Sequence, residues 1–150
     1  MTVSDLTAIP PLATWRMYFT ANAPETGVVT ISGNSYSKGL SDDGDQFFIQ
    51  AATDANGVPT YSYGTTVREF SGSTTDTVVG TADSGAFDQT KRTVTVSVSS
   101  TKLNAILSAA GHTTIGSKSV FCGLRGWAWE GSSLALEDLT RGGTELTVTP

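Results

Sequence analysis

The stretch RTVTVSVS, at Arg92–Ser99, carries the clearest strand signal in the chain. Three valines, Val94, Val96 and Val98, alternate in it with threonines and serines. Successive side chains of a strand point to opposite faces, so one face of this stretch is apolar and the other is polar. That alternation predicts a strand with one buried and one wet face, which is typical of an antiparallel sheet.

A second strand is predicted upstream, at Leu12–Ala21. Its alternate residues divide into two sets, with Trp15, Met17 and Phe19 on one face and Arg16, Tyr18 and Thr20 on the other. Runs rich in Thr, Val, Phe and Tyr predict further strands at Gly27–Ser32, Gln46–Thr53, Thr60–Tyr63, Thr66–Phe70, Thr77–Ala82, Lys118–Glu130 and Gly143–Thr149. Loops are predicted after Ser32 and at Asp83–Asp88, and a tight turn at Asp54–Gly57.

One helix is predicted, from about Thr101 to Ala110. Ser99 or Ser100 can cap its start, and Gly111 can end it. Short strands separated by turn residues, with a single helix, predict one all-β domain over residues 1–150. We expect an antiparallel β-sandwich, jelly-roll-like or immunoglobulin-like, of about eight or nine strands with one short helix.

Composition and charge exclude several classes of partner. The chain has 150 residues, a net charge of -5 and nine scattered Lys and Arg residues, whereas a dedicated nucleic-acid binder needs a basic patch. Apolar runs stay well short of the roughly 20 residues that span a bilayer, so we expect no membrane insertion. The start, Met1–Asp5, has no signal-peptide pattern.

Catalytic motifs are sparse, and we expect no enzyme. A thiol nucleophile at Cys122, or a serine triad, would need the single histidine, His112, which follows the predicted helix in a turn. A buried structural thiol is the alternative for Cys122. Paired carboxylates for glycoside hydrolysis are present in number, but the sequence does not determine how far apart they lie.

An acidic cluster around Gly44 is a candidate metal site. Asp42, Asp43 and Asp45 are closely spaced carboxylates that could bind Ca²⁺ through hard oxygen ligands. The competing interpretation is ordinary turn chemistry, since Asp-Gly and Ser-Asp pairs are common in turns. Other acidic residues, Asp83, Asp88, Glu137 and Asp138, could join a site only if the fold brings them together.

Two pairs of aromatic residues are candidate binding residues. In Arg125–Glu130, the side chains of Arg125, Trp127 and Trp129 share one face if the segment is extended. Three interpretations stay open: core packing, a platform on which sugars stack, and a structural stack of arginine on tryptophan. Tyr61 and Tyr63 form a similar pair of lower specificity.

Several short phrases occur together in one order along most of the chain: Thr14–Phe19, Gly39–Phe48, Tyr63–Thr65, Gly85–Asp88, Gly123–Gly126 and Thr140–Thr144. Together they resemble accessory β-sandwich domains at the ends of large secreted bacterial proteins, such as subtilisin-like proteases and other extracellular hydrolases. The resemblance implies a secreted, non-catalytic module, and it supplies no site residues.

The expected function is therefore an extracellular binding or adhesion module with a polysaccharide or a cell surface as ligand. The alternative is a structural module that pairs with other protein chains or copies of itself, through edge strands or a swapped N-terminal arm, Met1–Leu12. A small hydrolase that uses carboxylates is a third hypothesis.

Overall fold

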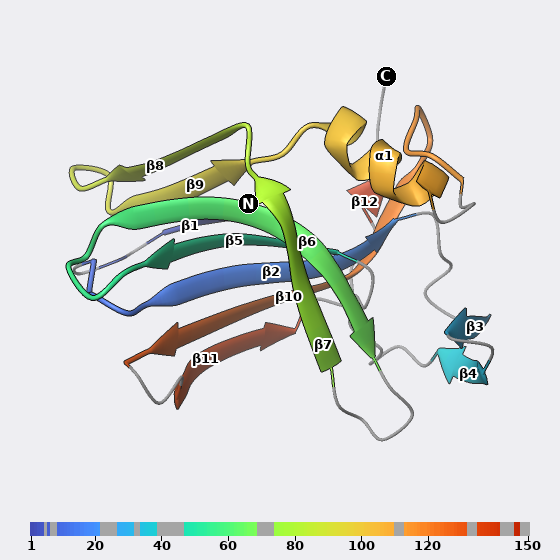
Figure 1. Cartoon of the computed structure of the whole chain (residues 1–150), viewed down its shortest axis with the longest axis horizontal. Coiled ribbons are helices and arrows are strands. Elements are labelled where there is room, and N and C mark those ends of the chain that lie inside the picture. Colours follow the sequence, from blue (N-terminus) through green and yellow to red (C-terminus); the bar gives the residue numbers. More distant parts are fainter. Residues whose placement is uncertain are drawn as a thin grey trace.

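Two antiparallel sheets stack face to face (Figure 1). The computed structural model describes residues 1–4, 6, 9–21, 27–31, 34–38, 47–68, 74–109, 113–131, 135–141 and 146–147. Helix α1 (Ser100–Ala109) follows the small sheet and lies at one end of the sandwich. The predicted all-β sandwich with one short helix is confirmed.

The large sheet has the strand order β11-β10-β2-β5-β6-β7. Its strands are β11 (Ala135–Arg141), β10 (Val120–Glu130), β2 (Thr14–Ala21), β5 (Phe47–Thr53), β6 (Pro59–Arg68) and β7 (Thr74–Thr81), and β12 (Leu146–Thr147) pairs with the start of β10.

The small sheet has the order β1-β9-β8, with β1 (Thr2–Val3), β9 (Thr93–Ser97) and β8 (Ser84–Asp88). A separate hairpin pairs β3 (Gly27–Ile31) with β4 (Asn34–Lys38). In the described part, eight strands of five or more residues build the two stacked sheets, which agrees with the number expected.

The main core lies between the two sheets. Val94 and Val96 of β9 are fully buried, as the alternation in RTVTVSVS predicts. The large sheet and the helix contribute the buried side chains of Trp15, Phe19, Phe47, Ile49, Leu103 and Leu107. The Ser99 hydroxyl accepts a hydrogen bond from the Lys102 amide at 3.5 Å, so Ser99 caps the helix. Gly111 and His112 lie outside the described residues.

The sequence predicts two non-strand segments that are wrong, and both contain a glycine. Gly64 lies inside a single long β6 rather than between two strands, and the segment predicted as a loop at Asp83–Asp88 contains strand β8. A Cβ on Gly64 would lie 2.1 Å from the Thr77 carbonyl oxygen, and one on Gly85 would lie 2.0 Å from Cγ of Tyr61. These glycines permit close packing between elements, which local sequence does not reveal.

Two more strands differ from the sequence prediction. A loop is expected after Ser32, but Asn34–Lys38 form β4, whose polar residues show no apolar alternation. Strand β11 is likewise unpredicted, because its acidic and basic residues interrupt any apolar pattern. The tight turn before β6 is confirmed: Asp54 Oδ1 accepts from the amides of Asn56 and Val58 at 2.8 Å each. Gly57 there has a φ of 77°.

The first residues pair within their own chain. Thr2 and Val3 pair with Thr95 and Val94 of β9, and the terminal amino group donates to the Val96 carbonyl at 2.9 Å. Four residues of the segment that the assembly hypothesis treats as a swapped arm pack against the core of the same chain: Met1, Val3, Leu6 and Ile9.

The close contact at Gly85 yields a stability prediction. We expect Gly85→Ala to lower the free energy of unfolding by about 1–3 kcal/mol, because the added methyl overlaps the Tyr61 ring and either β8 or the ring must move. Gly116→Ala is the matched control, since a Cβ there meets nothing within 4 Å. Urea unfolding of both variants measures the difference; equal stability would contradict this packing.

Candidate binding site on the outer face of the large sheet

The large sheet carries a second buried cluster on the face turned away from the small sheet. Tyr18 of β2 and Phe48 of β5 are buried there, although neither belongs to the core between the sheets. Cross-strand register brings their neighbours together: Trp127 pairs with Arg16, which pairs with Gln50, and Arg125 pairs with Tyr18. We call the following residues the outer-face cluster: Arg16, Tyr18, Phe48, Gln50, Asp76, Arg125, Trp127 and Trp129.

The two tryptophans form one end of the cluster. The ring centroids of Trp127 and Trp129 are 5.3 Å apart, and the ring planes are tilted by 50°. The Tyr18 ring meets Trp127 edge-on at 5.7 Å. Both tryptophans are partly exposed, whereas the third, Trp15, is buried between the sheets. The indole Nε1 of Trp127 is buried and has no hydrogen-bond partner among the described residues.

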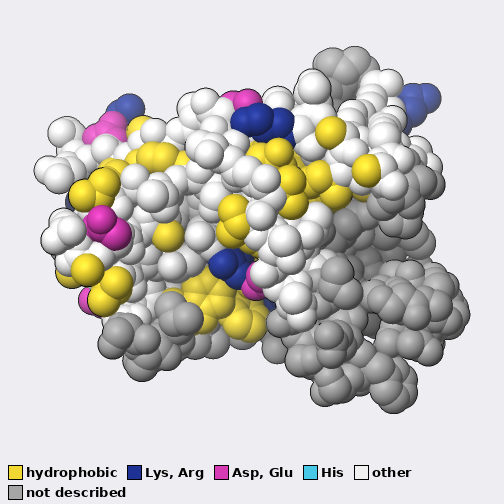
Figure 2. Space-filling view, viewed as in Figure 1, with side chains coloured by type: hydrophobic (Ala, Val, Ile, Leu, Met, Phe, Trp, Pro, Cys, Tyr) yellow, Lys and Arg dark blue, Asp and Glu magenta, His cyan; other side chains and the backbone are white. Residues whose placement is uncertain are grey.

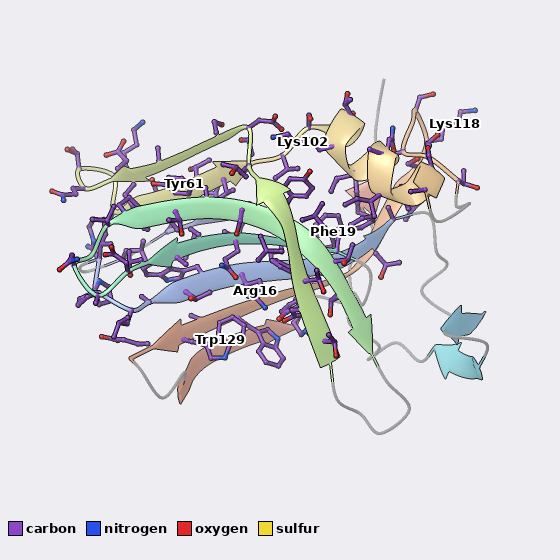
Figure 3. All side chains as sticks on the ribbon, viewed as in Figure 1. Arg16, Phe19, Tyr61, Lys102, Lys118 and Trp129 are labelled. Carbon is purple, nitrogen blue, oxygen red and sulfur yellow. The ribbon has the colours of Figure 1, made fainter. Side chains whose placement is uncertain are left out.

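Arg16 lies at the centre of the cluster. Its guanidinium carbon lies 4.2 Å from the ring centroid of Phe48 and 5.3 Å from that of Trp129. Figure 3 shows Arg16 and Trp129 on neighbouring strands of this face. The second guanidinium, that of Arg125, lies over Tyr18 and Trp127 at 4.8 and 4.7 Å. Each arginine therefore makes cation–π contacts with two or more rings.

Arg16 forms hydrogen bonds with three other side chains, two of which come from other strands. Arg16 Nε donates to Gln50 Oε1 at 2.8 Å, and its NH2 group also contacts that oxygen. Arg16 NH1 donates to the Tyr18 hydroxyl at 2.9 Å and forms an ion pair with Asp76 of β7. The Tyr18 hydroxyl donates in turn to Asp76 Oδ2 at 2.8 Å. This network joins β2, β5 and the edge strand β7.

Burial sets the ionisation of Tyr18. It raises the pKa of the phenol to about 12, the neighbouring Asp76 carboxylate acts in the same direction, and Arg16 opposes both. Tyr18 therefore stays a neutral hydrogen-bond donor to Asp76 over the physiological range.

Part of the cluster is accessible to solvent. Arg16, Gln50 and both tryptophans are partly exposed, whereas Tyr18 and Phe48 beneath them are buried. Figure 2 shows a hydrophobic patch on this face beside one basic and one acidic side chain. The outer face thus combines an apolar surface with polar groups at its edge.

The sequence-predicted aromatic residues fall at two separate places. Arg125, Trp127 and Trp129 share the outer face, so they do not fill the core between the sheets, and the predicted stack of arginine on tryptophan is present. Tyr63 is buried in the core, and Tyr61 packs against Phe87 at 6.0 Å on the inner side. The two tyrosines therefore do not join the tryptophans.

The acidic residues considered as metal ligands do not belong to the described part of one common site. Asp42, Asp43 and Asp45 lie outside the described residues, as do the side chains of Cys122, Glu137 and Asp138. Asp83 pairs with Lys102 at 2.9 Å and accepts from the Ser99 amide at the helix start, and Asp88 accepts from the Lys91 amide at 2.8 Å. In the described part, no three metal-ligating side chains of His, Cys, Asp or Glu gather.

The sequence does not predict five residues of the cluster as site residues: Arg16, Tyr18, Phe48, Gln50 and Asp76. Alternation assigns Arg16 to the face opposite Trp15, but it gives no sign that this face carries β10 tryptophans. Asp76 comes from a strand at the other edge of the sheet, sixty residues along the chain from Arg16. Only the register of the strands reveals the cluster.

The comparisons with known proteins add no relative. No protein-family model matches the chain, and neither a curated protein nor a solved structure gives a significant match. The resemblance to accessory domains of secreted proteins therefore stays a prediction.

None of the helices in the described part is long and apolar enough to cross a bilayer.

The raised pKa of Tyr18 predicts a loss of stability at alkaline pH. An unfolded chain releases this proton near pH 10, while the folded protein retains it to about pH 12. The stability due to neutral Tyr18 is therefore complete below pH 10 and is lost as the pH rises to about 12. Urea unfolding across this range should show a steeper loss for wild type than for Tyr18→Phe; parallel curves would contradict the assignment.

Proposed function

We propose that this protein is a non-catalytic binding module of a secreted protein and that its outer-face cluster binds a saccharide. The observation that carries the proposal is the partly exposed pair of Trp127 and Trp129 beside the polar groups of Arg16, Gln50 and Asp76. An aromatic ring offers an apolar surface to the C–H face of a sugar, and polar side chains at its edge take the hydroxyl groups.

The position of the tryptophans supports binding over a purely structural role. The main core is filled without them, by residues such as Trp15, Phe19 and Phe47. Two large, partly exposed aromatic rings on an outer sheet face leave apolar surface in contact with water. A ligand that covers this surface gains the free energy of removing it from water.

The cluster favours binding over hydrolysis. Cleavage of a glycosidic bond commonly uses two carboxyl groups on either side of the bond. Among the side chains that the structure describes in the cluster, Asp76 is the single carboxylate, and it is paired with Arg16. A binding module needs no second acid.

The test compares wild type with three variants in binding assays with soluble oligosaccharides and insoluble polysaccharides. We expect Trp129→Ala to weaken binding by about tenfold or more, because it removes an exposed stacking ring. Trp129→Phe, which keeps a ring, should lose less. Tryptophan fluorescence should also change on binding in wild type, since two of the three tryptophans lie at the site.

Val58→Ala is the matched control, because Val58 is an exposed apolar residue in the turn before β6 and lies outside the cluster. It should bind as wild type does. Equal binding by Trp129→Ala, or no saccharide bound by wild type in either assay, would overturn the proposal.

Self-association through β7 is a second candidate function. Strand β7 ends the large sheet, and Val78 and Val79 on it are 58% and 48% exposed. They border a shallow groove of about 450 Å³ that also includes Pro59–Ser62 of β6. An edge strand with exposed apolar residues can pair with another chain, and a second copy of this protein is the partner that we consider.

Lysine at Val78 tests this alternative, because a charge on an edge strand opposes pairing. Wild type should form dimers or larger species as its concentration rises in analytical ultracentrifugation, and Val78→Lys should remain monomeric. Val58→Lys adds the same charge at an exposed valine outside the sheet edge and should associate as wild type does. A wild type that stays monomeric at high concentration would exclude this function.

A further inference from the structure

Arg16, at the centre of the outer-face cluster, already has most of its hydrogen-bonding capacity satisfied within the cluster. Arg16 carries five N–H donors, and its contacts with Gln50, Tyr18 and Asp76 engage all three of its nitrogens. Its positive charge lies directly against the Asp76 carboxylate. Arg125 stacks on Tyr18 and Trp127 and has further partners of its own. Neither arginine stands as an isolated cation.

The orientation of the Gln50 amide follows from these contacts. A guanidinium can only donate, so the atom of Gln50 that meets Arg16 must be the amide oxygen. The amide nitrogen therefore points away from Arg16. Its two N–H donors have no partner among the described residues.

A free acceptor belongs to Asp76, the acidic partner of Arg16. Among the described residues, Arg16 and Tyr18 both donate to the same oxygen of Asp76, Oδ2. The other carboxylate oxygen, Oδ1, accepts no hydrogen bond from the described residues. Two partners of Arg16 thus keep free hydrogen-bonding groups: the amide nitrogen of Gln50 can donate, and Oδ1 of Asp76 can accept.

This pair of groups suits hydroxyls better than anions. A hydroxyl donates and accepts, so one sugar hydroxyl can accept from the Gln50 amide while another donates to Asp76 Oδ1. A carboxylate or sulfate on the ligand would come close to the Asp76 charge, and Arg16 is already paired there. We therefore expect the site to bind an anionic sugar more weakly than a neutral one.

The angle between the tryptophan rings limits the shape of the ligand. Their planes are tilted by 50° at a separation of 5.3 Å, so the two rings do not form one flat surface. A flat polymer surface can contact one ring at a time, whereas a soluble chain can place one sugar unit against Trp129, whose ring centroid lies 5.3 Å from the guanidinium carbon of Arg16. The geometry favours a free oligosaccharide over a planar, insoluble array.

We infer that the outer-face cluster is specific for an uncharged sugar unit, with Trp129 against its C–H face, the Gln50 amide donating to one hydroxyl and Asp76 Oδ1 accepting from another. The inference rests on the proposed function, because it names the ligand class of the same site.

Calorimetric titrations test the ligand class. The probes are neutral gluco-, manno-, galacto- and xylo-oligosaccharides, together with oligogalacturonate and a sulfated oligosaccharide. We expect at least one neutral probe to bind with an affinity that salt does not change, since no ligand charge is screened. Oligogalacturonate and the sulfated probe should bind at least about tenfold more weakly than that neutral probe.

Gln50→Glu tests the assigned donor. The variant keeps an oxygen for Arg16 and removes the two N–H donors, so the fold should persist while the affinity for the neutral sugar falls by about tenfold. Gln89→Glu makes the same chemical change at an exposed turn position and should bind as wild type does. Unchanged affinity in Gln50→Glu would overturn the role of this amide.

The outcomes separate this inference from the proposed function. Binding of charged probes alone, with affinity that falls as salt rises and is lost in Trp129→Ala, would overturn the neutral-sugar assignment and leave the binding module in place. Binding to insoluble polysaccharide alone would overturn the assignment of a free oligosaccharide. Absence of binding to every saccharide would overturn the proposed function itself.

Discussion

Phe47 and Phe48 are neighbours in β5, and both are 0% exposed. Adjacent residues of a strand point to opposite faces, so this sheet must be covered on both sides at the same level. The small sheet and α1 cover the side of Phe47. On the side of Phe48, the described cover consists of long side chains from neighbouring strands together with β7, whose Thr77 carbonyl lies close to Gly64. The remaining architecture follows from this double burial.

The two covers differ in chemistry. Between the sheets, apolar side chains from two separate layers interdigitate, and the free energy comes chiefly from burial. On the outer face, the cover over Phe48 is an arginine that is held by an amide, a phenol and a carboxylate. Such a layer covers Phe48 and at the same time presents polar groups, such as those of Arg16 and Gln50, to the solvent. This dual nature makes the outer face the strongest candidate for function.

The sequence was most informative where a strand has one dry and one wet face. Alternation identified β9 and β2 and assigned Trp15 and Arg16 to opposite faces, because burial there follows a period of two. It failed at Gly64 and Gly85, whose role depends on a carbonyl and a ring from other strands. The cluster was equally hidden, since strand register between β10, β2, β5 and β7 decides which side chains meet. Trp127 and Trp129 were recognised as sharing a face, but Asp76 had no local signal.

One irregularity in β7 constrains how the chain can change length. Gly64 pairs with Val78 but Tyr63 pairs with Gly80, so Val79 is an extra residue in the ladder. Before Val79, the alternation of the strand places Asp76 on the face where it meets Arg16. After Val79, it places Gly80 on the opposite face, against the Tyr63 ring. Loss of one residue here would force one of these contacts out of phase. A substitution at an exposed position of this strand leaves both contacts in place, whereas the gain or loss of a single residue turns one of them to the opposite face.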